Sequence, residues 1–484
     1  MAFLGRSTEL NRLEKLLSSD KAELAFVRGR RRVGKSWLLS EFRKNHVDEV
    51  FYFMGSDDAS DRRGREDFAE AWDYFAGTEL SDLKQTKLTW QRLFREMIEY
   101  AQKKRRHLLL CFDEIQWLCK GQSGFAGKIK EAWVDLEKYQ VKIIICGSSR
   151  KFFKESVEGD EKLLRGLKTQ ADIKVAEFTL SEVKNFYFSK WTDEQIILAY
   201  MMFGGLPYYL ERIESGNFIR SINDTAFLKE SIFLEEVDDI LGLEFNAAGV
   251  KTIKKLLGSL GPDGATVKKI IEKTGLPSTT VYDNIEKLKD YELVFEKVKM
   301  NGESSEIKYI LKDYFLNFYF QILEPLENKI KTNEHKALIF PGECIGSNTG
   351  YYVPNFSGKA FELLICRILE SKDSRNSQIF KILNIRDENY EIGTYWSMTT
   401  QVDLIVECET GREARILECK WINKENLKPA NYIQQVLDKE YEPNKGIETK
   451  TYFVAASQEV SASTKEIASK KGVVFIELKD LFDS

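Results

Sequence analysis

Short apolar runs alternate with amphipathic stretches along the first 150 residues of the chain. The apolar runs predict buried strands, and the stretches between them, with apolar residues at helical spacing, predict helices. The expected strands are 22–28, 50–54, 108–112 and 141–146, and the expected helices are 9–19, 33–45 and 88–102. Strands that alternate with helices are typical of a parallel sheet with helices on both faces, so we expect an α/β fold.

The hydrophobic pattern changes several times in the rest of the chain. Residues 180–245 have an all-helical pattern that Gly204–Pro207 interrupts, and residues 250–312 predict three helices followed by a hairpin. From residue 355 the pattern predicts one long helix, then three or more strands, then helices. We therefore predict four domains, with bounds 1–178, 179–246, 247–335 and 336–484.

The composition indicates a folded protein whose overall charge creates no positive electrostatic field that would attract nucleic acid. Hydrophobic residues make up 43% of the chain and the formal net charge is −4, so any DNA contact must come from a local patch. The seven cysteines include no C-x-x-C pair and the three histidines are scattered, which favours buried thiols in a reducing compartment. Without a signal pattern or a membrane-length apolar run, we expect a cytoplasmic protein that makes no membrane contact.

Residues Gly29–Ser36 fit the pattern G-x-x-x-x-G-K-[S/T] in full. Gly29 and Gly34 let the loop wrap, so that its backbone N–H groups point at phosphates and the following helix adds its positive end. Lys35 is expected on the β- and γ-phosphates and the Ser36 hydroxyl on Mg²⁺. The sequence therefore predicts a site for ATP and Mg²⁺, with the loop also formed by Arg30, Arg31, Arg32 and Val33.

Two further strand ends carry polar residues that suit the same site. The strand 108–112 leads into Asp113, expected to hold Mg²⁺ through water, and Glu114, expected to polarise the attacking water as the catalytic residue. The alternative is a buried strand with two solvated acids at its tip. The strand 141–146 leads to Ser148, whose hydroxyl is a candidate sensor of the γ-phosphate or simply part of a turn.

The motifs together resemble the prokaryotic AAA+/STAND ATPases that are called the archaeal ATPase family. The resemblance is carried by the following segments: Phe3–Arg6, the arginine-rich loop, Phe112–Gln116, Cys146–Ser149 and Gly204–Tyr208. It implies an ATPase core with a helical lid, and it implies homo-oligomers. Family members often carry Gly-Arg after the third strand, whereas this chain has Leu164-Arg165-Gly166, so Arg165 is a candidate residue acting on a neighbour's nucleotide.

Residues 266–311 have the pattern of a winged helix. Gly275 suits a helix C-cap, Pro277 suits the start of the next helix, and Asn301-Gly302 lies near the hairpin turn. Residues 251–312 hold 12 lysines and 9 acidic residues, a mild positive balance. DNA would contact the start of the second helix, at Ser278–Thr280, Tyr282 and Asn284, together with nearby lysines. The alternative is a winged helix that is used only for packing.

The C-terminal segment combines acidic residues with a lysine on neighbouring strands. Asp403 opens one predicted strand, and Glu418 and Lys420 lie on one face of the next. Asp403 and Glu418, with Glu362 on the preceding helix, would bind a divalent metal, and Lys420 would orient or deprotonate water. An exposed charged strand pair, or a degenerate fold kept for binding, is the alternative.

This arrangement resembles the PD-(D/E)XK nuclease fold, and also the domain of unknown function that often follows this type of ATPase. The resemblance implies Asp403, Glu418 and Lys420 as catalytic residues, while Gln401 replaces an acid that the family usually has.

We therefore expect an ATP-hydrolysing protein that handles DNA, whose nucleotide state controls Mg²⁺-dependent cleavage by the C-terminal half. The main alternative is an ATP-dependent regulatory or scaffold switch that binds DNA or protein and cuts nothing. A remodeller of a protein partner is the third class considered.

Overall fold

The computed structural model describes most of the chain, with gaps. The described residues are 3–57, 60–83, 88–104, 108–119, 124–153, 169–297, 299–300, 307–332, 339–340, 353, 356–371, 377–385, 389–397, 399–408, 412–421, 430–443, 446–457 and 459–483. They form two compact units, Met1–Glu177 and Phe178–Ser484.

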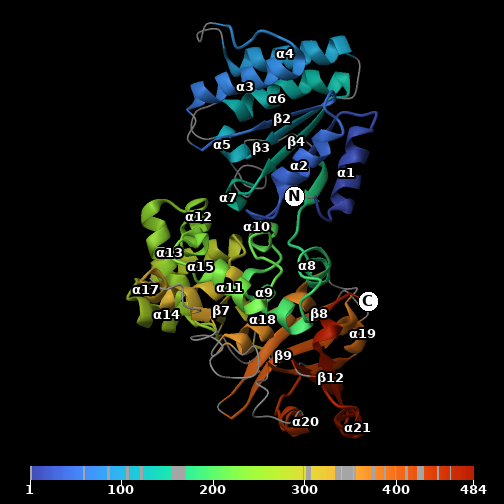
Figure 1. The fold of residues 1–484 in the computed structure, drawn as a ribbon, viewed down its shortest axis with the longest axis vertical. Coiled ribbons are helices and arrows are strands. Elements are labelled where there is room, and N and C mark those ends of the chain that lie inside the picture. The colour runs from blue at the N-terminus through green and yellow to red at the C-terminus, as the bar shows by residue number, and fades with distance from the viewer. Residues whose placement is uncertain are drawn as a thin grey trace. The chain divides into compact units, whose positions relative to one another are not determined.

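The first unit is built on a parallel five-stranded sheet, drawn in blue to teal in Figure 1. Its strands are β1 (Glu23–Arg28), β2 (Val50–Met54), β3 (Leu109–Asp113), β4 (Lys142–Gly147) and β5 (Thr169–Lys174), in the order β2-β3-β4-β1-β5. The predicted parallel sheet is confirmed. The polar strand β5, however, was not expected, because an edge strand needs no apolar run.

Helices cover both faces of this sheet (Figure 1). They are α1 (Ser7–Leu17), α2 (Lys35–Lys44), α3 (Asp61–Ala76), α4 (Trp90–Lys104), α5 (Ile115–Leu118), α6 (Phe125–Leu136) with the 3₁₀ turn η2 (Glu137–Tyr139), and α7 (Arg150–Phe153). Amphipathic spacing predicted α1, α2 and α4, and the structure adds the short helices α5 and α7 and the longer helices α3 and α6. Helices α3 and α6 both contribute large apolar side chains to the core.

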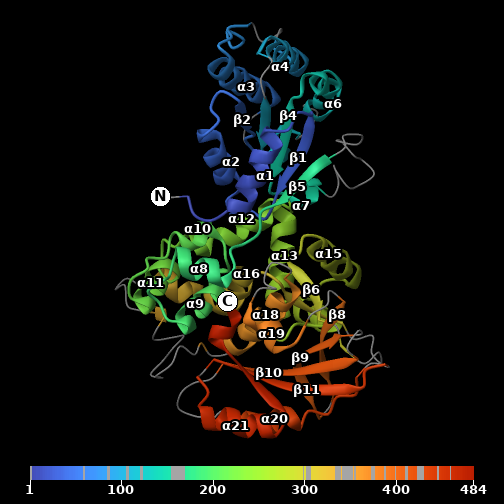
Figure 2. The same cartoon turned by 90° about the vertical axis from the view of Figure 1, so that its right-hand side faces the viewer.

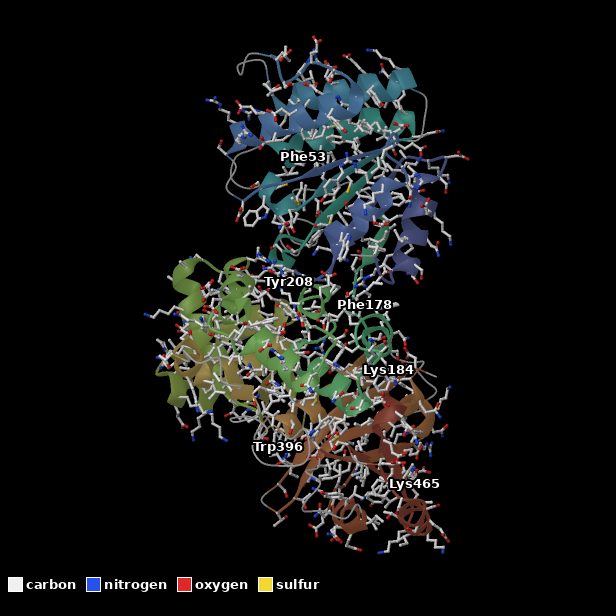
Figure 3. The ribbon with its side chains drawn as sticks, in the orientation of Figure 1. Phe53, Phe178, Lys184, Tyr208, Trp396 and Lys465 are labelled. Atoms are coloured by element: carbon white, nitrogen blue, oxygen red, sulfur yellow. The ribbon has the colours of Figure 1, made fainter. Side chains whose placement is uncertain are left out.

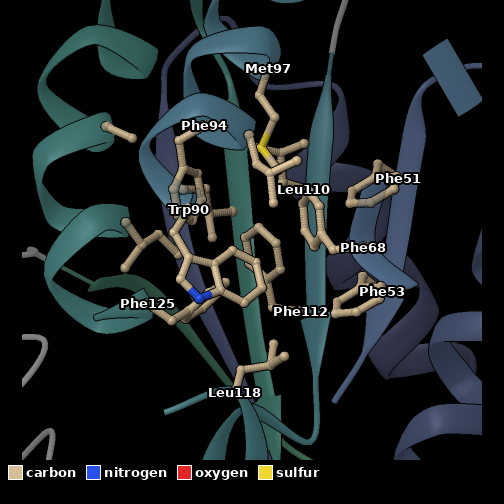
Figure 4. Packing of buried hydrophobic residues seen from close by; sticks show 14 of the residues in the cluster. Phe51, Phe53, Phe68, Trp90, Phe94, Met97, Leu110, Phe112, Leu118 and Phe125 are labelled. Atoms are coloured by element: carbon tan, nitrogen blue, oxygen red, sulfur yellow. The ribbon is translucent and has the colours of Figure 1, made fainter. Parts of the chain in front are cut away.

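An aromatic core fixes the strand that carries the predicted acids (Figure 4). The Phe112 side chain on β3 is fully buried, and its ring centroid lies 5.4 Å from that of Phe125 and 6.4 Å from that of Phe68. The Phe125 ring meets Phe112 edge to face and the Phe68 ring is stacked on it, and both arrangements add to the burial energy of the side chains. The residues that follow Phe112 therefore begin from a rigid position.

The second unit begins with helices, which confirms the all-helical pattern expected after residue 180. These are α8 (Leu180–Phe186), α9 (Asp193–Phe203), α10 (Pro207–Leu210), α11 (Phe218–Ala226), η4 (Ile232–Leu234) and α12 (Glu236–Gly242). Gly204 has φ 66°, and a Cβ at Gly205 would meet the Phe178 carbonyl oxygen at 1.9 Å, so the glycine pair allows the close turn between α9 and α10.

Three helices and a two-stranded antiparallel sheet follow. They are α13 (Ala247–Leu260), α14 (Val267–Thr274), α15 (Ser278–Asp290), β6 (Val294–Lys297) and β7 (Lys308–Leu311). Gly275 adopts the left-handed conformation that ends α14, and Pro277 precedes α15, as the sequence predicts. The Asn301-Gly302 turn lies outside the described residues, and assignment as a winged helix stays a prediction.

A mixed five-stranded sheet forms the C-terminal part, drawn in orange and red in Figures 1 and 2. Before it come α16 (Tyr314–Phe318), the π turn η5 (Tyr319–Leu323), α17 (Glu324–Thr332), α18 (Ser357–Glu370) and α19 (Gln378–Ile382). The sheet and its helices are β8 (Tyr390–Trp396), β9 (Gln401–Cys408), β10 (Glu413–Lys420), α20 (Ala430–Leu437), β11 (Thr449–Ala456), α21 (Ala462–Lys470), β12 (Val473–Glu477) and η8 (Leu478–Leu481).

Strands β8, β9 and β10 pair antiparallel, and β10, β11 and β12 pair parallel, while α20 and α21 lie side by side (Figure 2). The long helix and the two acid-bearing strands occur where the sequence predicts them. The expected order of three or more strands and then helices is wrong in one respect, because after β10 the helices α20 and α21 alternate with the strands β11 and β12.

Candidate nucleotide site and a second polar cluster

The loop between β1 and α2 has the backbone that the glycine pattern requires. Arg32 and Gly34 have φ values of 70° and 92°, in the left-handed region. A Cβ at Gly29 would meet the Val175 carbonyl oxygen at 2.4 Å, so only glycine fits there without a shift. Ser36 lies half-buried in the first turn of α2.

Lys35 lies folded into this loop. Its Nζ donates hydrogen bonds to the carbonyl oxygens of Gly29 at 2.9 Å and Arg30 at 3.0 Å. Burial lowers the pKa of the ammonium, whereas the nearby carboxylates of Glu114 and Asp113 raise it. A buried cation held only by carbonyl oxygens and two nearby acids is well suited to receive phosphate oxygens.

Asp113 is fully buried at the end of β3. Its Oδ2 accepts a hydrogen bond from the Tyr52 hydroxyl at 2.7 Å, and its Oδ1 accepts one from the Glu114 backbone N–H at 2.8 Å. Burial and the Asp113 charge raise the pKa of Tyr52, which keeps its phenol protonated as a donor. The carboxylate is therefore fixed in orientation.

Glu114 and Ser148 are joined directly. The Ser148 hydroxyl donates to Glu114 Oε2 at 3.0 Å, and the Gln116 amide donates to the same oxygen. Glu114 has φ 47°, a left-handed conformation that turns its side chain sharply away from the strand. Both predicted catalytic and sensing groups thus converge on one point beside Asp113.

The strand order explains this convergence. Strand β4 lies between β1 and β3, so the carboxyl ends of all three parallel strands meet at one edge of the sheet. This edge brings together Lys35, Asp113, Glu114 and Ser148 from segments far apart in the sequence. Arg165 lies outside the described residues.

The residues fit a magnesium–triphosphate complex. Mg²⁺ in such sites takes one or two protein oxygens and fills the other positions with phosphates and water. A buried, oriented Asp113 beside a lysine and a glycine-wrapped loop supplies that donor set. Asp113 and Ser36 would hold the ion, which would shield the phosphate charge.

Sequence reasoning missed three residues that support the site. Tyr52 and Gln116 hold the two acids, and Arg6 donates from its guanidinium to the Val33 carbonyl oxygen at 3.1 Å. Arg6 and Gln116 belong to segments that the sequence analysis gave only as carrying the family resemblance, without a role for either residue. The buried position of Arg6 and its φ of 63° show that it anchors the loop from the N-terminal side.

A second cluster of charged residues lies on the C-terminal sheet. Asp403 Oδ2 accepts the Cys419 backbone N–H at 2.9 Å, which places it beside β10 as the sequence predicts. Glu418 pairs with Lys420 and, at 3.0 Å, with Lys439. All three predicted acids are largely buried, and each has a nitrogen donor close by.

Glu362 on α18 lies close enough to Asp403 for their charges to interact. Burial and the Asp403 charge raise the pKa of Glu362 to about 7, while Lys359 at 2.6 Å and Lys297 at 4.0 Å oppose the shift. Among the described residues, no group of three or more histidine, cysteine, aspartate or glutamate side chains is arranged to hold a metal ion. The lysines hold the carboxylates in this arrangement.

The predicted DNA-contacting side of α15 is partly accessible. Tyr282 is 55% exposed, and the Asn284 amide donates to the Thr280 carbonyl oxygen at 2.7 Å. Lys289 is paired with both Glu286 and Glu296, so one expected phosphate contact is neutralised within the module.

Comparisons with known proteins show what the two parts of the chain are similar to. Residues 3–213 match the model of a family described as an ATPase domain predominantly from Archaea, which confirms the predicted ATPase domain. Residues 319–431 match the model of a family of archaeal and bacterial proteins of unknown function. The match agrees with the resemblance noted for the C-terminal part.

The chain is also similar to individual proteins. An uncharacterized protein of Methanocaldococcus jannaschii is 24% identical over 422 residues, which cover 87% of each chain. The Aeropyrum pernix ORC2 protein, solved as ADPNP and ADP complexes, has a TM-score of 0.41 and 11% identity, covering 67% of this chain and 93% of that one. The Aeropyrum pernix ORC1 protein in complex with DNA has a TM-score of 0.36 and 14% identity, covering 68% and 95%.

Across the described part of the chain, no helix combines the length and the apolar character needed to cross a bilayer.

Proposed function

We propose that this chain binds ATP with Mg²⁺, hydrolyses it at the β1–α2 loop, and uses the nucleotide state to control action on DNA by its C-terminal half. The observation that supports hydrolysis most strongly is the convergence of Lys35, Asp113, Glu114 and Ser148 on one edge of the sheet. Such a group can bind a γ-phosphate and also direct water at it.

Each residue has a separate role in this proposal. The loop N–H groups and Lys35 bind the phosphates, and Glu114 orients and polarises the attacking water. Ser148 and Gln116 hold Glu114 until the γ-phosphate offers the Ser148 hydroxyl an alternative acceptor. The freed carboxylate then faces the water, which couples ATP binding to the catalytic position of Glu114.

Phosphate release from ATP tests this proposal, measured with and without single- and double-stranded DNA. Lys35→Ala should abolish nucleotide binding, whereas Glu114→Gln should bind ATP and fail to hydrolyse it. Lys44, an exposed lysine of α2 paired with Glu41, provides a matched control as Lys44→Ala. If the wild-type protein neither binds nor hydrolyses ATP with Mg²⁺, the proposal is wrong.

We also propose that the C-terminal cluster cleaves DNA in a Mg²⁺-dependent reaction. The close, buried pair of Glu362 and Asp403 supports this, because two carboxylates that repel each other form a donor set for a cation. In this scheme Glu362 and Glu418 would leave their lysine partners and move toward Asp403 to hold the metal, because the three carboxylates are not arranged around one ion in this structure, and Lys420 would orient the water. Plasmid nicking in Mg²⁺ that is lost in Lys420→Ala but kept in Lys35→Ala would support it.

The rival function is a switch that binds DNA or protein and cuts nothing. It is favoured by the lysine partners of the cluster, which occupy Glu362 and Glu418 in this structure. A gel shift whose affinity follows the nucleotide state, with no cleavage in Mg²⁺ or Mn²⁺, would favour the switch over the nuclease.

The proposal also includes assembly into homo-oligomers and a protein partner. It further includes a role for Arg165 on the nucleotide of a neighbouring subunit. Light scattering in the presence of ATP measures whether the protein assembles into oligomers. ATP turnover, compared between wild type and Arg165→Ala, then measures the contribution of Arg165 separately from assembly.

A further inference from the structure

The β6–β7 hairpin is attached to the C-terminal sheet. The Met300 backbone N–H donates to the Thr394 carbonyl oxygen at 2.8 Å, and Lys299 forms a parallel bridge with the same residue of β8. On the other side, Tyr309 of β7 exchanges two backbone hydrogen bonds with Ala265, just before α14. The hairpin therefore holds α14 and β8 in one continuous assembly within the second unit.

Lysines and aromatic rings meet at this attachment. Lys308 Nζ lies 4.3 Å from the centroid of the Trp396 ring, which is labelled in Figure 3. Lys299 Nζ lies 5.6 Å from the Trp396 ring and 5.6 Å from the Tyr395 ring. Both rings are half-buried at the end of β8. Cation–π contacts fix the lysines without neutralising their charge.

Like charges accumulate around Lys308. Burial lowers the pKa of Lys308, and the positive charges of Lys297 and Lys269 lower it further, while Asp263 acts in the opposite direction. Among the described residues, no carboxylate lies within ion-pair distance of the Lys269, Lys299 or Lys308 side chain. This differs from Lys289 of α15, which two glutamates neutralise.

The same group of lysines reaches the carboxylate cluster. Lys359 pairs with Asp263 at 3.1 Å and with Glu362 at 2.6 Å, and Lys297 lies 4.0 Å from Glu362. The charge of Lys359 also acts on Lys308. A chain bound to the unpaired lysines would thus lie beside Glu362 and Asp403.

We propose that Lys269, Lys299 and Lys308, together with the rings of Tyr395 and Trp396, bind the phosphate backbone of a DNA strand at the hairpin–β8 attachment. Unpaired lysines interleaved with aromatic rings are the combination that binds single-stranded nucleic acid, because lysines contact phosphates and rings contact bases. A polyanion also relieves the mutual repulsion of these lysines. This inference rests on the proposed action on DNA, and it places the DNA on the hairpin rather than on α15.

Binding of a fluorescein-labelled single strand of about 20 nucleotides, followed by fluorescence anisotropy in EDTA, tests the inference. EDTA removes cleavage from the measurement, and KCl is varied from about 50 to about 300 mM. For single strands, each phosphate contact contributes about 0.7 to the slope of log affinity against log salt. Lys269→Gln with Lys308→Gln should therefore lower the slope by about 1.4.

The matched control is the double variant Lys190→Gln/Lys229→Gln, which replaces two exposed lysines in the helical part of the same unit. It carries the same change in net charge and should leave the slope unchanged. Lys308→Arg keeps the charge and should retain the wild-type slope. An equal slope in the Lys269/Lys308 variant and wild type, or an equal loss in the control, overturns the inference.

Two further measurements separate this inference from the proposed function. ATP turnover without DNA should match wild type in the Lys269/Lys308 variant, since both residues lie outside the unit Met1–Glu177 that holds the nucleotide site. The denaturant midpoint should stay close to that of wild type, because the loss of the Lys308–Trp396 cation–π contact is offset by the loss of repulsion among the lysines. DNA binding that persists unchanged in the variant overturns the hairpin site alone. If wild type hydrolyses ATP but shows no salt-dependent DNA binding, the proposed action on DNA fails together with the hairpin site, and the ATPase proposal stands.

Discussion

Replacing Tyr52 with phenylalanine tests whether the buried carboxylate of Asp113 is held in place for Mg²⁺. The substitution removes only the hydroxyl that donates to Asp113 Oδ2 at 2.7 Å and keeps the ring. Asp113 then retains the hydrogen bond from the Glu114 N–H at 2.8 Å, on the other oxygen, and its side-chain contact with Cys146. The carboxylate should lose its fixed orientation without a cavity in the core.

The size of the effect follows from the type of bond that is lost. A hydrogen bond to a charged group contributes about 1.5–3 kcal/mol. Residues that orient a metal-binding group cost about 10- to 100-fold in metal affinity or activity when they are removed. We therefore expect Tyr52→Phe to raise the Mg²⁺ concentration needed for half-maximal ATP turnover by about 10- to 100-fold.

The assay is phosphate release at saturating ATP across a titration of free Mg²⁺. Tyr74→Phe is the control, because the Tyr74 side chain is 87% exposed on α3. Mg²⁺ requirements that are the same in Tyr52→Phe, Tyr74→Phe and wild type would refute the role assigned to Asp113. A variant that turns over slowly at every Mg²⁺ concentration, with an unchanged midpoint, would refute it as well.

Three further outcomes are expected. Glu114→Gln should lower turnover by about 100-fold or more while ATP binding by calorimetry is retained. Ser148→Ala should lower turnover by about tenfold, since it removes the hydroxyl that would leave Glu114 and bind the γ-phosphate; unchanged turnover would contradict that sensing role. Although burial alone would raise it, hydrogen bonds from Lys465 and Lys479 hold the pKa of Glu477 at about 2, below its ordinary 4.5. An acid whose pKa is lowered by folding stabilises the fold fully above its unfolded pKa, and this stabilisation is lost as the pH falls toward its folded pKa. Wild type should therefore lose more free energy of unfolding than Glu477→Gln between pH 4.5 and pH 2, measured by urea unfolding at each pH.

Local patterns in the sequence were sufficient for much of the fold and for the centre of the nucleotide site. Strand β2 has the bounds 50–54 that its apolar run predicts. Lys35 was identified from the glycine-lysine pattern of Gly29–Ser36, and Asp113, Glu114 and Ser148 were identified because they stand at the ends of apolar strands. A buried parallel strand carries that signal in its own residues, so no knowledge of its neighbours is needed.

Strand β5 shows where this reasoning fails. Its residues Thr169–Lys174 include threonine, glutamine, aspartate and lysine, and it pairs only with β1 at the edge of the sheet. Arg28 of β1 donates from its Nε to Asp172 at 2.8 Å, so part of the strand pairing is made by charged side chains. Edge strands with charges carry no hydrophobic pattern that a sequence can reveal.

The supporting residues of the site depend on strand order and register, which one sequence does not contain. Tyr52 lies opposite Cys111 in the β2–β3 pair, and residues two apart in a strand point to the same face. Tyr52 therefore shares a face with Asp113, about 6.6 Å further along, a step that its long side chain can cover. In the β3–β4 pair, Phe112 lies opposite Ile145. Continuing this register by two residues places Glu114 beside the residue that precedes Ser148. A shift of one residue in either register would turn the donor to the other face, so these contacts follow from the assembled sheet and not from any single strand.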